Sequence, residues 1–375
     1  MRTTCIALML LLFTSINAKQ VYSVVIKNTS DVDQTERLVE IPLQKIKVDK
    51  RQLQVMDAKG VEQLSQITSD NTLLFQAKVG AGKCEVYYIS DQGKSDQSTV
   101  KVYGRYFTER YGDFAWENDR VGFRLYGSPL EKVQAPTNGI DLWLKRTERM
   151  VLEDWYANDL SKKASYHIDH GEGCDPYGVG PTLGAGAIAP YINDEIVRNT
   201  NHTGYRIIDN GPLRIKFEIA YPNLEIEGRS IPDSKIITLD AGSYYTKVEQ
   251  NYGGNKLDVA VGVVKRTGES SLYVSEDGKF MVYEEPEMPK DGQVYVGVIF
   301  PKGKMVAKQD HYTIGKSDFR HNLATTTASK KSFVYYTGFG WSKSNHPTLN
   351  DFVTYTKNFV EALESPLKIK IQKIK

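Results

Sequence analysis

The sequence has little net charge and no long apolar run beyond its first residues. It holds 48 Lys and Arg against 46 Asp and Glu, which leaves a formal charge of +2 on 375 residues. A chain without a basic excess lacks the electrostatic footprint of nucleic-acid binding. Mean hydropathy is −0.42, and no later run approaches the ~20 apolar residues of a membrane-spanning helix. We therefore expect neither a nucleic-acid partner nor a membrane span.

Cysteine is also scarce, with three residues in the chain. The first lies in a start typical of a cleaved secretory signal: a positive N-terminus, the apolar run Cys5–Phe13, and the small residue Ala18 before the cleavage point. Residues 1–18 are thus predicted to be a signal peptide, and the protein to be secreted or periplasmic. The mature chain keeps Cys84 and Cys174. These could pair in an oxidising compartment, although two cysteines so far apart are more often unpaired.

Helical periodicity is rare, whereas short β-forming runs between turn-forming clusters are frequent. Residues 19–103 contain several such runs and are predicted to form a small β-sandwich domain. The runs continue through residues 104–375, where Leu213–Ile219 alternates apolar with charged residues. This alternation is typical of an antiparallel sheet with one solvated face. We expect a mainly β chain whose second domain holds two packed antiparallel sheets and the candidate catalytic site.

One helix is predicted near the C-terminus. Thr348 and Asp351 are spaced as a capping box, apolar residues recur at helical spacing up to Leu363, and Ser365-Pro366 ends the pattern. A last strand is expected at 367–371.

The segment 166–186 differs from the rest because it combines six glycines with two of the six histidines and three carboxylates. Functional groups concentrate in loops that a rigid scaffold holds, and glycines let a backbone approach a ligand. The alternative is a turn-rich connection whose polar residues are merely solvated. Function is favoured, because loops of this length without structure of their own are usually functional or disordered, and the aromatic residues argue against disorder.

Two kinds of site can be built from the histidines of this loop. His167, His170 and one carboxylate could bind a divalent metal. The spacing His-x-x-His is common, however, no second ligand cluster is present, and nothing in the sequence requires a cofactor. Alternatively, a histidine could act as base or acid near neutral pH, with Tyr166 or Tyr177 as the second proton carrier. The proton-transfer site requires fewer side chains to come together by chance than the metal site does.

A third kind of site is a hydrolytic carboxylate pair. Its members could come from Asp169, Glu172 or Asp175, but the sequence does not indicate which carboxyl groups converge.

Residues outside the loop supply the parts of a groove for an anionic sugar. Lys145 and Arg146 end a predicted strand just upstream, and such cations can neutralise a carboxylate; the alternative is the solvent face of a strand. In the segment 338–347, Trp341 lies between small residues and close to Lys343. We expect Trp341 to be an exposed platform for a sugar ring, with core packing as the alternative.

The candidate site residues have two predicted roles, catalysis and substrate binding. The predicted catalytic residues are His167, His170, Tyr166, Tyr177 and Glu172. The predicted substrate-binding residues are Lys145, Arg146, Trp341, Lys343 and Asp175.

Four stretches together resemble a family of secreted bacterial proteins that is labelled as a domain of unknown function. They are AWENDRVGFRLYG at 115–127, NGIDLWLKRT at 138–147, the segment 167–186 that opens with HIDHGEG, and GWSK at 340–343. The resemblance covers nearly the whole mature chain. Members of that family occur with polysaccharide-degrading genes. The resemblance implies a carbohydrate-related role and an antiparallel β-supersandwich similar to galactose mutarotases and polysaccharide lyases, and it implies no particular reaction.

We expect an extracytoplasmic enzyme that acts on uronate-containing polysaccharides or oligosaccharides, with a β-eliminating lyase as the leading hypothesis. One of the two cations before the loop would neutralise the carboxylate, one histidine would take the C5 proton, and one tyrosine would protonate the leaving oxygen. The alternatives are a glycoside hydrolase or a sugar mutarotase or epimerase on the same scaffold, and a non-catalytic glycan-binding protein.

Overall fold

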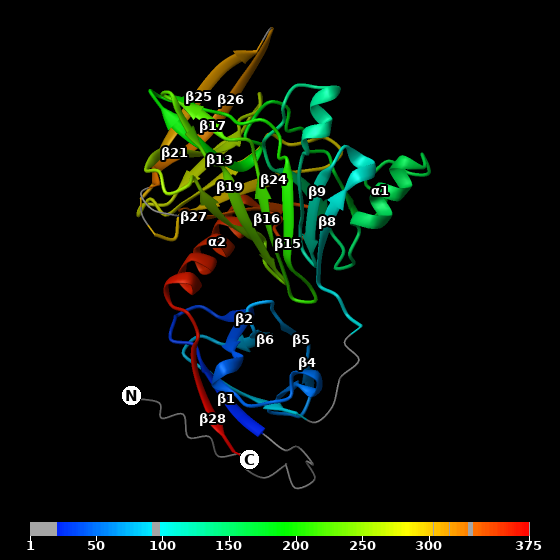
Figure 1. Ribbon diagram of the computed structural model, residues 1–375, viewed down its shortest axis with the longest axis vertical. Helices are drawn as coiled ribbons and strands as arrows, with labels where there is room; N and C mark the ends of the chain where they lie inside the picture. The colour runs from blue at the N-terminus through cyan, green and yellow to red at the C-terminus, as the bar shows by residue number, and fades with distance from the viewer. Residues whose placement is uncertain (1–20, 92–97, 303, 315, 329–332, 375) are drawn as a thin grey trace. The chain divides into compact units, whose positions relative to one another are not determined.

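The computed structural model describes residues 21–91, 98–302, 304–314, 316–328 and 333–374 (Figure 1). The predicted signal peptide, residues 1–18, lies outside these ranges. Within them the chain is built mainly from antiparallel β-strands, with two α-helices, α1 (Leu152–Leu160) and α2 (Leu349–Glu364). The predicted mainly β fold is therefore confirmed.

The chain divides into two compact units. Unit 1 comprises Met1–Val100, Gly211–Leu213 and Asn358–Lys375, and unit 2 comprises Lys101–Asn210 and Arg214–Lys357. Four short 3-10 turns, at Leu43–Lys45, Lys50–Gln52, Thr108–Arg110 and Ser128–Lys132, complete the helical structure of the described residues.

Unit 1 is a sandwich of two antiparallel sheets. Its five-stranded sheet has the order β28-β1-β7-β3-β4, and its three-stranded sheet has the order β2-β6-β5. Apolar side chains of both sheets form one buried core, with Val24 of β1, Ile41 of β2 and Phe75 of β6 among them. The strands are β1 (Val21–Lys27), β2 (Gln34–Pro42), β3 (Gln54–Asp57), β4 (Glu62–Gln63), β5 (Ser65–Ile67), β6 (Thr72–Val79), β7 (Cys84–Ser90) and β28 (Lys368–Lys373).

Unit 1 includes the last strand of the chain. β28 pairs antiparallel with β1, with Ile371 opposite Val24 and Ile369 opposite Ile26. The sequence predicted this strand at 367–371 but placed all of residues 104–375 in the second domain. The difference has a physical cause, because β1 has one edge on β7 and leaves the other edge for a further strand.

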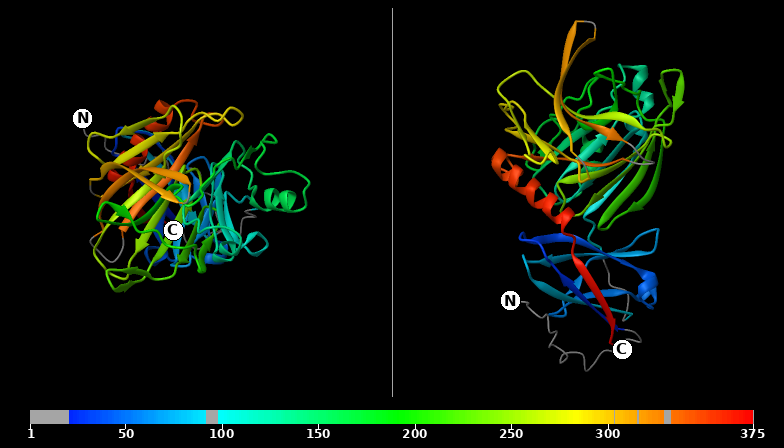
Figure 2. Two further views of the ribbon diagram at one scale, coloured as in Figure 1. Left: turned by 90° about the horizontal axis from the view of Figure 1, so that it is seen from above. Right: turned by 90° about the vertical axis from the view of Figure 1, so that its left-hand side faces the viewer.

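Unit 2 contains three large antiparallel sheets. The first has the order β12-β11-β10-β9-β8, the second β14-β13-β21-β26-β25, and the third β15-β16-β19-β20-β27-β24-β23-β22. β25 and β26 form a long hairpin that extends beyond the neighbouring strands of the unit (orange in Figures 1 and 2).

The strands of unit 2 are β8 (Val102–Phe107), β9 (Asp113–Asn118), β10 (Gly122–Leu125), β11 (Asp141–Lys145), β12 (Gly173–Cys174), β13 (Ala185–Ile192), β14 (Glu195–Ile196), β15 (Gly204–Asn210), β16 (Arg214–Ala220), β17 (Leu224–Ile226), β18 (Arg229–Ile231), β19 (Ser234–Asp240), β20 (Tyr245–Asn251), β21 (Leu257–Val264), β22 (Ser271–Val274), β23 (Phe280–Glu284), β24 (Val294–Ile299), β25 (Val306–Ile314), β26 (Ser317–Ala328) and β27 (Phe333–Trp341). β17 and β18 pair only with each other.

The eight-stranded sheet is the central layer of unit 2, and the two five-stranded sheets cover one of its faces. Thr246 on β20 and Thr337 on β27 lie opposite each other in the ladder, so they point to the same face. The hydroxyl of Thr246 accepts a hydrogen bond from Trp116 Nε1 of β9 at 3.3 Å. The hydroxyl of Thr337 donates to the carbonyl of Ala185 on β13 at 2.6 Å. Both five-stranded sheets therefore stack on that face.

Helix α2 covers the opposite face of the central layer. Tyr245 precedes Thr246 on β20 and so points the other way. Its hydroxyl is 2.7 Å from that of Thr356 on α2, and its ring stacks with Phe352 at 5.6 Å between centroids. Stacked antiparallel sheets with few helices agree with the predicted supersandwich class.

Helix α2 begins and ends where the sequence predicted. The backbone N–H of Thr348 donates to the Asp351 carboxylate at 2.9 Å, and the N–H of Asp351 donates to the Thr348 hydroxyl at 3.3 Å, which is a capping box. Helix α1 was not predicted, because its nine residues carry too few helical repeats to stand out. Among the described residues, no helix combines the length and the apolar character needed to cross a membrane.

Lys145 and Glu117 form an ion pair in the interior of unit 2. Both side chains are 0% exposed, and Nζ lies 2.5 Å from Oε2. The other Glu117 oxygen accepts the backbone N–H groups of Val151 and Leu152, at 2.8 and 2.9 Å, where α1 begins. The pair thereby ties β9, β11 and α1 together. The predicted role of Lys145 in substrate binding is wrong, because its cation neutralises a core carboxylate.

Replacing Lys145 with methionine should destabilise unit 2, since the Glu117 carboxylate would stay buried without a counter-charge. Loss of one partner from a buried pair costs about 3–5 kcal/mol. We expect a decrease of that size in the free energy of unfolding, measured by urea denaturation. Tryptophan fluorescence is a suitable readout because all four tryptophans, Trp116, Trp143, Trp155 and Trp341, lie in unit 2.

The matched control is Arg206→Ala, which removes a surface ion pair with Glu218. Exposed pairs contribute about 0–1 kcal/mol, so this variant should unfold close to the wild type. Equal losses for the two variants would contradict the structural role of the buried pair.

Candidate functional site

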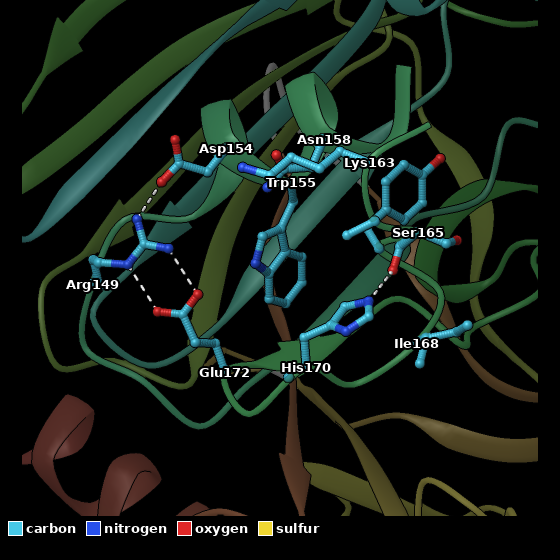
Figure 3. Close-up of a pocket in the computed structure, with 12 residues that line it drawn as sticks. Arg149, Asp154, Trp155, Asn158, Lys163, Ser165, Ile168, His170 and Glu172 are labelled. Atoms are coloured by element: carbon cyan, nitrogen blue, oxygen red, sulfur yellow. Dashed lines mark hydrogen bonds and ion pairs between the residues drawn. The ribbon is translucent and has the colours of Figure 1, made fainter. Parts of the chain in front are cut away.

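The predicted loop leaves α1 and crosses β11 before it reaches β13. At the crossing, Gly173 pairs with Lys145 as part of β12. The φ angle of Gly173 is 121°, and a Cβ there would collide with the carbonyl of Leu144. A glycine is therefore required where the loop backbone lies against the strand. Between α1 and this part of the loop is a cavity of about 330 Å³, which we call the loop cavity (Figure 3).

The walls of the loop cavity come from the residues before α1, from α1 itself and from the loop. Figure 3 shows the indole of Trp155 at its centre, with Arg149 and Glu172 on one side and His170 on the other. The cavity therefore brings together three of the predicted catalytic residues. The lining residues are Arg149, Asp154, Trp155, Asn158, Lys163, Ala164, Ser165, Tyr166, Ile168, His170, Glu172 and Gly173.

Glu172 is held as a carboxylate by Arg149. Two guanidinium nitrogens donate to its two oxygens at 2.7 and 2.8 Å, and Asp154 also pairs with Arg149. Hydrogen bonding to Arg149 lowers the pKa of Glu172. Glu172 is thus ionised at neutral pH, which makes it a poor proton donor but a good acceptor of hydrogen bonds from a bound hydroxyl.

His170 is an exposed wall of the loop cavity with a fixed tautomer. Its Nε2 lies 3.2 Å from the carbonyl oxygen of Ser165. Because a carbonyl can only accept, Nε2 carries a hydrogen, and in the neutral ring Nδ1 carries the lone pair.

Tyr166 connects the loop cavity to the interior. Its ring lines the cavity and stacks on Trp143 at 5.1 Å between centroids. Its hydroxyl accepts hydrogen bonds from Arg110 and, at 3.3 Å, from Arg124. Burial raises the pKa of Tyr166 against the opposing effect of the two guanidinium groups. The hydroxyl is therefore protonated over the neutral range and can donate a proton.

A buried group of charges surrounds Arg124, and we call it the arginine cluster: Arg124, Asp113, Asp141 and Asp175. Arg124 Nη2 lies 2.8 Å from Asp175 Oδ2, Nε donates to Asp141 at 2.8 Å, and Nη1 is 3.8 Å from Asp113. Tyr126 donates its hydroxyl hydrogen to Asp141 at 2.7 Å. The second oxygen of Asp175 is buried and has no hydrogen-bond partner among the described residues.

Three carboxylates around one guanidinium cannot all be ionised cheaply. Burial, followed by the charge of Asp141, raises the pKa of Asp175 well above its usual range. Burial also raises the pKa of Asp113 to about 6, against the opposing charge of Arg124. The raised pKa values of Asp175 and Asp113 mean that the buried cluster takes up a proton more readily than exposed carboxyl groups do.

His167 lies at the edge of the arginine cluster. Its Nδ1 is 2.6 Å from the carbonyl oxygen of Asp175, and 57% of its side chain is exposed. The carbonyl fixes a hydrogen on Nδ1, so in the neutral ring Nε2 carries the lone pair. The ring also packs against Tyr166 at 4.4 Å between centroids. His167 and His170 therefore belong to the cluster edge and to the loop cavity, respectively.

Three predicted substrate-binding residues lie elsewhere. Arg146 pairs with Asp169 at 2.9 Å, so its charge is compensated within the loop. Trp341 is 1% exposed and donates through Nε1 to a backbone carbonyl at 2.5 Å. The predicted exposed platform is therefore wrong, because Trp341 fills the core at the end of β27. Lys343 donates to the carbonyl of Lys290 and lines neither the cavity nor the cluster.

Tyr177 is a buried side chain beside a different ion pair. The guanidinium of Arg266 lies 4.7 Å from its ring centre and pairs with Glu285 at 2.9 Å. Burial and then the charge of Glu285 raise the pKa of Tyr177. The structure thus separates Tyr177 from Tyr166, and Tyr166 is the tyrosine that adjoins the loop cavity.

The sequence interpretation missed the arginine cluster. Its members Asp113, Arg124 and Asp141 lie on β9, β10 and β11, outside the segment 166–186 in which the site was predicted. A signal was present, because Arg124 interrupts the otherwise apolar strand β10 and Asp141 begins the strand β11, and a charge that such a strand buries requires a partner.

In the described part of the chain, the loop forms neither a cluster of metal ligands nor a disulfide. Among the described residues, no group of three or more His, Cys, Asp and Glu side chains is arranged to hold a metal ion. Cys174 is a free, buried thiol, so it does not pair with Cys84.

Comparison with solved structures finds two chains from Enterococcus faecalis, a protein in glycosyl hydrolase family 38 and an alpha-mannosidase. Their TM-scores are 0.48 and 0.47, each with 10% sequence identity and with 96% of this chain covered. This chain spans about half the length of each, 48% and 47%. A likeness this distant carries no conclusion about activity.

Comparison of sequences gives a nearer relative. Protein P7 of Formosa agariphila, described as uncharacterized, is 30% identical over 328 residues, which cover 85% of this chain and 82% of the relative. The model of the domain of unknown function DUF4861 matches residues 26–369. The resemblance to a family of that label is thereby confirmed. Because the match extends over most of its length, this chain belongs to the DUF4861 family.

Proposed function

We propose that this protein is a carbohydrate-active enzyme that transfers protons to and from a sugar beside the hydroxyl of Tyr166. One observation carries the proposal. The ring of Tyr166 lines the loop cavity, while its hydroxyl accepts hydrogen bonds from Arg110 and Arg124. Tyr166 therefore belongs both to a cavity large enough for a sugar unit and to a group of side chains that can transfer protons.

The loop cavity suits one sugar unit next to the reacting unit. Its volume of about 330 Å³ lies in the range of small-molecule sites. Trp155 and Tyr166 offer aromatic surface for the apolar face of a sugar ring. Glu172, fixed by Arg149, and His170 offer an acceptor and a tautomer-fixed imidazole for its hydroxyls. The reacting unit then lies at the Tyr166 hydroxyl, next to His167.

The proposed acid is Tyr166 and the proposed base is His167. Tyr166 keeps its proton because burial raises its pKa, and two guanidinium groups at its oxygen would stabilise the phenolate that forms on donation. His167 presents the lone pair of Nε2, since Nδ1 is bound to the carbonyl of Asp175. Both roles use side chains of this chain and need no cofactor.

This pair of groups favours β-elimination on a uronic acid. His167 would take the C5 proton, the C4–O bond would break as the C4–C5 double bond forms, and Tyr166 would protonate the leaving oxygen. Neither group needs to form a covalent bond to the sugar. The leading reaction predicted from the sequence is thus retained as a proposal, with Tyr166 and His167 as its acid and base.

Hydrolysis is the second candidate, and one observation favours it. The pKa of Asp113 is raised to about 6, so a fraction of this carboxyl group, about one-tenth at pH 7, keeps the proton that a hydrolytic acid needs. Asp113 does not line the loop cavity, however, whereas Tyr166 does, which favours Tyr166 as the reacting group.

Removing the proposed acid or base should reduce turnover strongly. Tyr166→Phe and His167→Gln should each lower kcat by about 10²- to 10⁴-fold, the usual contribution of a positioned proton carrier. The measurement is absorbance of an unsaturated product, with reducing-end release as a second readout, on a panel of uronate-containing and neutral glycans. Circular dichroism and thermal unfolding would check that both variants fold.

The product identifies the reaction. An unsaturated sugar supports elimination, and a saturated sugar released at the same site supports hydrolysis with Asp113 as a reacting group. Full activity of both variants would contradict the proposed site. If the wild type binds glycans but turns none over across the panel, the protein is a glycan-binding module and the enzymatic proposal fails.

His170→Ala should separate the loop cavity from the reacting groups. Because His170 contacts the neighbouring sugar unit and not the reacting atoms, we expect KM to rise about 5- to 20-fold, the loss of one or two hydrogen bonds. We expect kcat to stay within about twofold of the wild type. A large fall in kcat at unchanged KM would instead assign the base to His170.

A further inference from the structure

Most of the cations near the loop and the arginine cluster are already paired with carboxylates in the structure. Lys145 is paired with Glu117 in the core, Arg146 with Asp169, and Arg149 with two carboxylates. Arg124 is surrounded by the three carboxyl groups of the arginine cluster. An acidic sugar therefore needs a different cation.

Arg110 is a cation beside the proposed acid with donors to spare. It ends the 3-10 turn Thr108–Arg110, is only partly exposed, and donates to the hydroxyl of Tyr166. Its guanidinium carbon lies 5.5 Å from the centre of the Tyr166 ring. Among the described residues, no carboxylate lies within 4.0 Å of it. A guanidinium has five N–H donors, and a neutral hydroxyl uses only part of that capacity.

The charge of Arg110 acts on the site rather than on bulk solvent. It lowers the pKa of Tyr166, Asp113 and Asp175, in each case against the larger effect of burial. An arginine is also the side chain that matches the two oxygens of a carboxylate.

We propose that Arg110 binds the carboxylate of an acidic sugar unit and so selects uronates over neutral sugars at the Tyr166 hydroxyl. This inference rests on the proposed function and names the substrate class of the same site. In an elimination, the same contact would stabilise the negative charge that develops on the carboxylate as C5 loses its proton.

The test compares acidic and neutralised substrates. We would measure kcat/KM for the uronate glycan that the wild type turns over and for the methyl ester of that glycan. Arg110→Gln should lower kcat/KM on the free acid by about 100-fold, the usual effect of removing one such donor. It should lower the ester rate much less, because the ester carries no charge for Arg110 to recognise and loses only the support that Arg110 gives to Tyr166. Arg110→Lys should be intermediate, since it keeps the charge without the fork.

Lys163→Gln is the matched control. Lys163 lines the loop cavity, is exposed, and has no carboxylate within 4.0 Å among the described residues. Its removal should leave the preference for the acid over the ester unchanged. If Lys163→Gln abolishes that preference and Arg110→Gln does not, the carboxylate lies in the loop cavity and the inference is overturned. Equal losses on acid and ester in Arg110→Gln would mean that Arg110 only positions Tyr166, which also overturns it.

A binding measurement tests the role of Arg110 independently of whether the protein is an enzyme. Calorimetry with glucuronic and galacturonic acid, against glucose and galactose, needs no turnover. Preferential binding of the acids that is lost in Arg110→Gln supports the inference even if no glycan is turned over, in which case only the enzymatic proposal fails. If glycans are turned over and neither binding nor turnover depends on Arg110, the inference about Arg110 fails and the enzymatic proposal stands.

Discussion

The guanidinium of Arg124 is the interaction on which the candidate site depends. A charge at 4% exposure would be expensive without partners. Its partners Asp113, Asp141 and Asp175 come from β9, β11 and the loop, so compensating one buried cation also fixes the loop against the sheet. The same guanidinium donates to Tyr166. The position of the proposed acid and the stability of the loop therefore have one electrostatic origin.

The surroundings of that cation divide the site into a buried half and an exposed half. The arginine cluster is built on three neighbouring strands and is almost fully buried, which suits groups that must hold their orientation. The loop cavity is built on α1 and exposed loop residues, where side chains such as Lys163 and Ile168 extend from the surface. Substitutions in the loop cavity can therefore alter which ligand is bound without disturbing the charges of the arginine cluster.

The sequence predicted the fold better than the site. Period-two alternation and the capping box at Thr348 are local patterns, and local patterns determine strands and α2. The loop was recognised from its histidines and glycines, and Tyr166, His167 and His170 do adjoin the cavity or the cluster. Lys145 and Trp341 were misplaced because alternation along a strand does not tell which face is buried when both faces are covered. The arginine cluster is assembled from separate strands, and only tertiary pairing brings those residues together.

The pairing of β1 with β28 determines the order in which the protein can be completed on the ribosome. The two strands are adjacent in the sheet, yet Val24 and Ile371 are separated by nearly the whole chain. During synthesis the first strands of unit 1 emerge early and keep an open edge while unit 2 is made. The N-terminal unit is therefore the last to be finished, and unit 2 can fold before the sheet that precedes it in the sequence is closed.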